Sequence, residues 1–474
     1  MNLYFDVWLA LGLLFFASYL MSHRTYLSMS FPIFGVVTLS SLAALISVSL
    51  AQIDLGFSVL SGSALIAAII VFTSKPGGKK AARAAFFSTL YSFGVAAISL
   101  FTQVFGVAGV GFSDGFTIMR TSLWIQGVVG ESPLDGSKGL KRGWGMSSVQ
   151  ALGDRGEYLV GFVPVIFIVA IICSLLIIFR VLKDRSVAIV LSATTFVVLL
   201  STEAVLRHLY LMNSHSLIWL ALAVLILILL DQRTFEMRGR SLVAVLPVIS
   251  AIAFARFDAL WVIAPLLVPI LLATYRSKRT NGLLILVSAL GPLATWLLIA
   301  VTNFPLGGPV GIGIVVFGVV LAFLLTNAII PVGWLEFGKL KKIYFWLALG
   351  ITLLAFLLAN ATSSLQGMFA NFLLGEGLWG ATIICLVGLA LIASILKRKK
   401  PTEELFGLIH AAGFLMISLL FAAKLGDGFE DGILGGGLVR SGWGDSINRM
   451  IVVYVPFAVL FVANFVGRLT RKSS

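Results

Sequence analysis

The feature that most constrains this chain is a succession of apolar runs, each long enough to cross a lipid bilayer. Of its 474 residues, 59% are hydrophobic and only 11% are charged, against roughly 25% charged in an ordinary soluble domain. Mean hydropathy is +1.06. A hydrocarbon core about 30 Å thick needs about 20 apolar residues per helix, and a helix satisfies its own backbone hydrogen bonds inside lipid. The sequence therefore predicts an all-α polytopic membrane protein with about fifteen transmembrane helices.

We place these helices at the apolar runs 5–22, 30–52, 56–73, 86–108, 158–180, 187–206, 212–230, 241–257, 259–275, 282–302, 310–330, 343–359, 379–396, 404–423 and 450–467. The break between the eighth and ninth rests on Arg256 and Asp258, because no polar loop separates these two runs. We expect no separate soluble domain, and we name three parts of the chain: N-terminal additional helices (1–85), a core (86–302) and C-terminal helices (303–474).

Charge gives the expected orientation. Most of the 34 Lys and Arg residues fall on one side of this map, and cytoplasmic loops carry the excess of positive charge. We therefore expect a multi-pass protein of the cell (inner) membrane with its N-terminus outside and its C-terminus in the cytoplasm. The net charge of +14 is explained by the Lys and Arg residues concentrated on the cytoplasmic side. Anionic membrane lipids are therefore the expected partners. No clustered basic arm or aromatic platform suggests nucleic acid.

Polar residues gather on the expected outer side, first in the long loop 109–157, which begins near Asp114 and includes Arg120. Large apolar residues recur there at helical spacing, at Phe116, Met119, Leu123 and Trp124. This pattern predicts a short amphipathic helix along the membrane surface. An interfacial helix that only packs against the bundle would show the same pattern.

The second polar group lies at the outer ends of the sixth and seventh helices. Glu203 and Arg207 are four residues apart and can pair on one helix face. Ionisable residues near the hydrocarbon are costly and are functional candidates by default, although a structural ion pair is an equal alternative. His208 and His215 with Glu203 could also be arranged as metal ligands, but their spacing matches no standard motif.

Two further groups complete the outer side. Arg256 and Asp258 must find partners in the protein or sit in a wet cavity, because almost no loop is available to solvate them. The glycine-rich loop 424–449 could bring its backbone amides close to an anion, and a flexible surface loop would have the same composition. This loop carries Arg440, Asp445 and Arg449.

Together these residues predict an outward-facing cavity, at membrane level, lined by carboxylates and arginines. Arginine presents a planar fork suited to phosphate, and a carboxylate near a hydroxyl can act as a general base. A substrate with a phosphate at the lipid surface and a long apolar tail suits such a cavity, and a polyprenyl-phosphate-linked sugar is one such molecule. The acceptor could be a glycan, a lipid or a protein.

Two motifs carry a family resemblance. The segment D114-G-F-T-I-M-R-T-S-L-W-I-Q126 resembles the start of the first extracytoplasmic loop of GT-C glycosyltransferases, where an Asp, a Thr, an Arg and a Trp-x-Gln follow an early helix. The segment G442-W-G-D-S-I-N-R-M450 is similar to a closing segment of bacterial members. The resemblance implies a GT-C-like core over 86–302 and an inverting transferase with Asp114 as the catalytic base. Arg120 matches by type only, and Ile118-Met119 stands where a Tyr-His pair often occurs.

Other site assignments are inferred from placement along the chain. As donor-phosphate contacts we expect, besides Arg120, the arginines Arg207, Arg256, Arg440 and Arg449. As additional acidic or polar site residues we expect Glu203, His208, Asp258 and Asp445. No protein metal site is predicted, and a divalent metal cofactor is left open. Cys173 and Cys385 both fall inside predicted helices, which argues against a disulfide framework or a cysteine metal site.

Three other classes of protein fit the same outline. A lipid or lipid-linked-sugar transporter or flippase would also use charges in an apolar bundle, but it needs a path to the cytoplasmic face. A polysaccharide polymerase or ligase would use Arg and His in an outer loop and needs no Asp at the head of the first large loop. A non-catalytic subunit of a membrane complex would account for the many helices without an assigned role.

Overall fold

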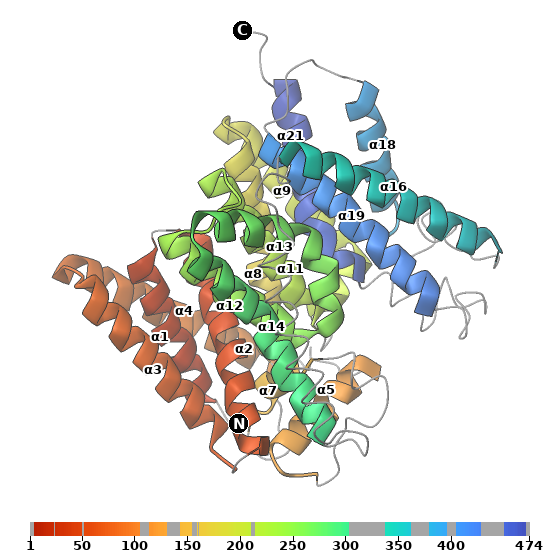
Figure 1. The fold of residues 1–474 in the computed structure, drawn as a ribbon. Helices are drawn as coiled ribbons and strands as arrows, with labels where there is room; N and C mark the ends of the chain where they lie inside the picture. The colour runs from red at the N-terminus through yellow and green to blue at the C-terminus, as the bar shows by residue number, and fades with distance from the viewer. Residues whose placement is uncertain are drawn as a thin grey trace.

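The computed structural model describes residues 4–22, 24–49, 52–104, 113–129, 143–153, 159, 161–209, 214–302, 337–361, 379–395, 404–427 and 450–470. Within these ranges every regular element is a helix (Figure 1). The all-α prediction is therefore confirmed for this part of the chain. The predicted segment 310–330 and the loop residues 428–449 lie outside the described residues.

The first helices pack against one another: α1 (Phe5–Met21), α2 (Thr25–Ser49), α3 (Leu55–Ser74) and α4 (Gly78–Val104). Close approach of α1 and α4 depends on Gly12, where an added Cβ would lie 2.2 Å from the Ser92 hydroxyl oxygen. Ser88 uses this proximity to donate a 2.6 Å hydrogen bond to the Gly12 carbonyl. Such contacts suit helices in lipid, where small residues let backbones come together.

The remaining elements are α5 (Ser113–Ile125), α7 (Gly145–Gln150), α8 (Phe162–Val181), α9 (Arg185–Ser201), α10 (Glu203–Leu206), the 3-10 turn η1 (Arg207–Leu209), α11 (His215–Gln232), α12 (Gly239–Ala255), α13 (Phe257–Ser277), α14 (Arg279–Thr302), α16 (Phe337–Ala361), α18 (Thr382–Ile395), α19 (Glu404–Asp427), the 3-10 turn η2 (Val452–Tyr454) and α21 (Val455–Thr470). The predicted boundary at residue 85 lies within α4. The division of the chain at residues 85 and 302 stays a prediction.

Six helices in the described part are long and apolar enough to cross a membrane: Thr25–Val48, Leu55–Ser74, Gly78–Thr102, Phe162–Val181, His215–Gln232 and Val452–Thr470. A seventh span results if Arg185–Ser201 and Glu203–Leu209, which are bent by 79° at their junction, are counted as one. Shorter apolar helices occur at Phe5–Met21, Gly239–Ala255, Ile263–Ser277 and Glu404–Leu420. A multi-helix membrane protein fits these elements, while the count of about fifteen spans stays a prediction.

Helix α11 lies in the middle of the bundle, against α8, α12, α21 and η2 (Figure 1). Every residue from His215 to Leu229 is buried. Trp219 anchors it to α8, donating a 2.9 Å hydrogen bond to the hydroxyl of Ser174 and meeting the ring of Phe167 edge to face. A helix that is apolar on all sides belongs in the interior, and α11 occupies that position.

The peripheral helices expose large apolar side chains. Phe72 on α3 is 78% exposed, Phe93 on α4 is 71% exposed and Leu357 on α16 is 68% exposed. Many large apolar side chains exposed at this level are expected where lipid is the solvent. The outer surface of the bundle thus agrees with the composition in indicating a membrane environment.

Contacts between helix ends agree with the predicted alternation of the chain across the bilayer. Lys80, at the start of α4, donates to the Leu20 carbonyl at the end of α1. The hydroxyl oxygens of Thr202, after α9, and Thr382, at the start of α18, lie 3.3 Å apart. Each contact joins ends that the sequence map assigns to one side. Which side faces the cytoplasm stays a prediction.

Candidate functional site

The candidate site lies at the end of the bundle where two short helices of the loop 109–157 meet the tips of longer ones. Helix α5 occupies the position at which a loop helix was predicted, and so that prediction is confirmed. It packs against α7 and α2. Its first turn contains Asp114, whose backbone is helical and whose side chain is outside the described structure.

The face of α5 that packs against the protein is not the face that carries the large apolar residues. Ile118, Thr121, Ser122 and Ile125 are buried, whereas Met119, Leu123 and Trp124 are only half-buried and Arg120 is exposed. The hydroxyls of Thr121 and Ser122 donate to backbone carbonyls within the helix at 2.8 and 2.7 Å. Because their polar atoms are satisfied, these small residues can pack closely against the neighbouring helix. The larger apolar residues are displaced to the flank.

Helix α7 connects α5 to α12 and is entirely buried. Gln126, just after α5, donates to the carbonyls of Ala151 and Gly153 beyond α7, at 3.5 and 3.1 Å. On the other side, Gly143 approaches α12 so closely that an added Cβ would lie 2.0 Å from the Phe254 carbonyl oxygen. Sequence reasoning missed α7, since a six-residue helix has no readable period.

Two polar side chains of α7 and its N-cap are buried without a hydrogen-bond partner in the described part of the chain. They are the indole nitrogen of Trp144 and both amide atoms of Gln150. Buried polar side chains are ordinarily hydrogen-bonded, and so these atoms are set apart as positions that a polar ligand or water would satisfy. Gln150 carried no signal in the sequence that distinguished it from a loop residue.

The break between α12 and α13 is the single extended residue Arg256. This confirms the predicted junction, although α12 ends at Ala255 and α13 starts at Phe257. Arg256 Nη1 lies 3.0 Å from Nε2 of His215, at the start of α11. Because a guanidinium is always a donor, His215 Nε2 accepts this hydrogen bond, and the ring is neutral with its proton on Nδ1. Asp258 follows in the first turn of α13, and its side chain is outside the described structure.

His208 lies next to His215, with ring centroids 6.0 Å apart and the rings edge to face. It is fully buried on η1. Its Nδ1 is 2.8 Å from the carbonyl oxygen of Ala204. A carbonyl can only accept, so Nδ1 carries a proton and donates this hydrogen bond. The sequence placed His208 and His215 in one polar group, whereas the His215–Arg256 contact could not be inferred from spacing because it joins different helices.

Glu203 and Arg207 form the predicted ion pair, with 2.6 Å between Arg207 Nη2 and Glu203 Oε1. The Glu203 side chain is 60% exposed and that of Arg207 is 26% exposed. This pair is therefore on the surface beside the buried histidines. An exposed i,i+4 pair contributes only about 0.3–0.5 kcal/mol.

The structure thus brings Arg207, His208, His215 and Arg256 to one end of the bundle, and places Arg120 on an exposed face of α5. Arg440, Asp445 and Arg449 lie outside the described residues. The next residue, Met450, is buried, and η2 directly after it packs against α11. Among the described residues no group of three or more His, Cys, Asp or Glu is placed to hold a metal ion.

Comparison of the chain with protein families, with curated sequences and with solved structures found no match in any of the three.

Proposed function

We propose that this protein is an integral-membrane, GT-C-like glycosyltransferase that moves a sugar, with inversion, from a polyprenyl-phosphate donor to an acceptor on the extracytoplasmic face. The observation that carries the proposal is the half-buried Arg256 at the helix break, in contact with the neutral His215. A cation at such a position is well suited to a phosphate at the membrane surface. The loop helix bearing Asp114 lies at the same end of the bundle, connected to α12 through α7.

The reaction needs a general base for the acceptor hydroxyl and cations for the leaving phosphate. The carboxylate of Asp114 takes the proton of the acceptor hydroxyl, the acceptor oxygen bonds to the anomeric carbon, and the bond from that carbon to the phosphate oxygen breaks. The polyprenyl phosphate leaves with added negative charge, which Arg256 stabilises, and Arg207 is a second candidate nearby. A preorganised cation in a site shielded from water stabilises such charge more strongly than water would. His215 holds the guanidinium in place without neutralising it.

A polysaccharide polymerase or ligase is the second candidate, and the buried His208 beside His215 favours it. In that case the same donor class would be used, and the histidines would replace Asp114 as the base. In this candidate the His208 ring is neutral and takes the proton at Nε2, because Nδ1 donates to the Ala204 carbonyl. The two candidates predict different essential residues. Sugar transfer depends on Asp114 in the first and on a histidine in the second.

The first test asks whether a polyprenyl phosphate, or its glycosylated form, copurifies with the gently purified protein in native mass spectrometry. We expect it in the wild type and expect less of it in Arg256→Ala. The matched control is Arg240→Ala, which removes an exposed arginine from the opposite end of the same helix. Only bulk phospholipid in repeated preparations would refute the donor class.

The second test measures sugar transfer from the copurified donor in lipid nanodiscs. Asp114→Asn should abolish transfer and leave thermal stability unchanged. Its control is Asp6→Asn, which changes an exposed carboxylate at the equivalent second position of another helix, α1. Transfer retained in Asp114→Asn but lost in His208→Gln would replace the transferase assignment by the polymerase or ligase one.

A further inference from the structure

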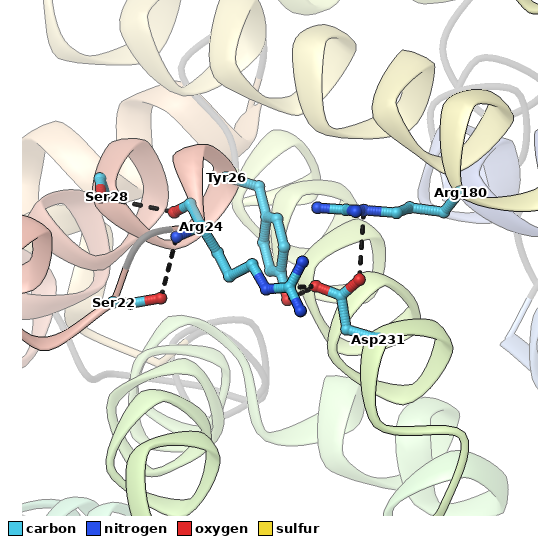
Figure 2. Close-up of polar contacts among 6 residues, drawn as sticks. All are labelled: Ser22, Arg24, Tyr26, Ser28, Arg180 and Asp231. Carbon is cyan, nitrogen blue, oxygen red and sulfur yellow. Dashed lines mark hydrogen bonds and ion pairs between the residues drawn. The ribbon is translucent and has the colours of Figure 1, made fainter. Parts of the chain in front are cut away.

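A second polar cluster lies at the opposite end of α11 from His215. Asp231 there is approached by two arginines, one just before α2 and one in the last turn of α8 (Figure 2). Arg24 Nε is 3.3 Å from Asp231 Oδ2, and Arg180 Nε is 3.2 Å from Oδ1. Tyr26 donates its hydroxyl to Oδ2 at 2.9 Å. The carboxylate is thus shared between α2, α8 and α11.

The local backbone fixes one of these arginines. Arg24 precedes α2, and its backbone N–H donates to the Ser22 hydroxyl at 3.1 Å, while its carbonyl accepts from Ser28 at 3.4 Å. Arg180 is in the last turn of α8. In Figure 2 the two side chains converge on Asp231 from opposite directions, with the Tyr26 ring between them. All three helix ends belong to the side that the sequence assigns to the cytoplasm.

The cluster has an excess of positive charge, since two guanidinium groups share one carboxylate. Each guanidinium lies close to Asp231 at Nε, and in the described part of the chain neither arginine side chain forms an ion pair or hydrogen bond with any other residue. The arginine side chains remain 47% and 37% exposed, whereas that of Asp231 is 10% exposed. The carboxylate is therefore covered, whereas both arginine side chains stay partly accessible.

From this geometry we infer that Arg24 and Arg180 form a binding site for a phosphate group, which the Nη donors of the two guanidiniums hold above Asp231. A guanidinium binds phosphate through two parallel hydrogen bonds, and one fork from each side suits its oxygens. A membrane lipid headgroup and a soluble phosphate share this chemistry. The cluster stands at the ends of the apolar helices α8 and α11, and helices that span a bilayer end near the lipid phosphates. Asp231 aligns the forks and prevents the arginines from repelling one another.

The test measures binding of dioctanoyl phosphatidylglycerol to the purified full-length protein in detergent, by native mass spectrometry. Arg24→Gln and Arg180→Gln should each weaken binding about tenfold, the size of one charged contact. Arg240→Gln, an exposed arginine on the same side, should bind as the wild type does. Asp231→Asn should bind more tightly, because it removes the negative charge beneath the phosphate. An effect of this sign is not expected of a cluster that only holds helices together.

Competition with inorganic phosphate distinguishes a site for soluble phosphate from a site for a lipid headgroup. Displacement of the lipid by millimolar phosphate would identify a site for the phosphate group itself, and resistance to it would identify a lipid headgroup site. Thermal unfolding of each variant checks that it is folded. If a glutamine variant does not fold, Arg24→Lys keeps the charge but loses the fork, and it should weaken binding a few fold. Wild-type affinity in the arginine variants, or weaker binding by folded Asp231→Asn, would overturn the proposal.

Discussion

Replacing Gly143 by alanine tests how α7 is held against α12. The nearest atoms to an added Cβ are the Phe254 carbonyl oxygen at 2.0 Å, the Phe254 carbonyl carbon at 2.7 Å and the Ala255 carbonyl carbon at 2.9 Å. All three are backbone atoms, so no side-chain rotation relieves the clash. Ordinary contact begins at 3.4 Å, and the two segments must therefore separate by about 1.4 Å. We expect a loss of about 1–3 kcal/mol in stability, as for other overpacked sites.

Two measurements detect this change without knowledge of the reaction. Thermal unfolding in detergent should show a lower midpoint for Gly143→Ala, and hydrogen exchange should be faster over 144–150. The control is Gly94→Ala in α4, where nothing lies within 4 Å of the added Cβ. It should be neutral or stabilising by up to about 1 kcal/mol, because alanine is the better helix former. Wild-type unfolding and exchange in Gly143→Ala would refute the close contact.

Two further changes probe the core and the edge of the candidate site. Trp219→Phe should lower stability by about 1–3 kcal/mol in thermal unfolding, because it removes buried volume and the hydrogen bond to Ser174; an unchanged midpoint would contradict the anchoring role. Glu203→Gln should change stability by less than about 0.5 kcal/mol, because the pair with Arg207 is exposed. A large loss of sugar transfer in this variant at unchanged stability would show that Glu203 acts in the reaction.

What the sequence predicted correctly depended on local pattern. The Arg256 junction was visible because two apolar runs meet there without a loop. The Glu203–Arg207 pair followed from helical spacing, which fixes neighbours four residues apart. The loop helix α5 was predicted from its period, but its buried face was not. That face is selected by the helices packed against it, and Ser122 can face them because its hydroxyl is satisfied within its own helix.

The contacts that the sequence did not reveal join residues from different helices. Asp231 lies 205 residues after Tyr26, and His215 and Arg256 are 41 apart. In the sequence each appears as an isolated polar residue at the edge of an apolar run. Which helix ends meet is set by packing of apolar surfaces that resemble one another. The predicted orientation reduced the number of helix ends that could meet, because it assigned Arg24, Arg180 and Asp231 to the same side of the membrane.

The burial of α11 on every side has a consequence for assembly of the protein in the membrane. Helices α2 and α8 precede it in the chain, whereas α12, η2 and α21 follow it. If helices enter the bilayer in the order of synthesis, part of the surface of α11 faces lipid until its later partners arrive. A polar stripe reserved for those partners would be costly during that interval. Its surface is instead apolar throughout, with His215 and Asp231 confined to the two ends. The apolar surface that allows α11 to form the centre of the bundle therefore also suits it to contact with lipid before its later partner helices are inserted.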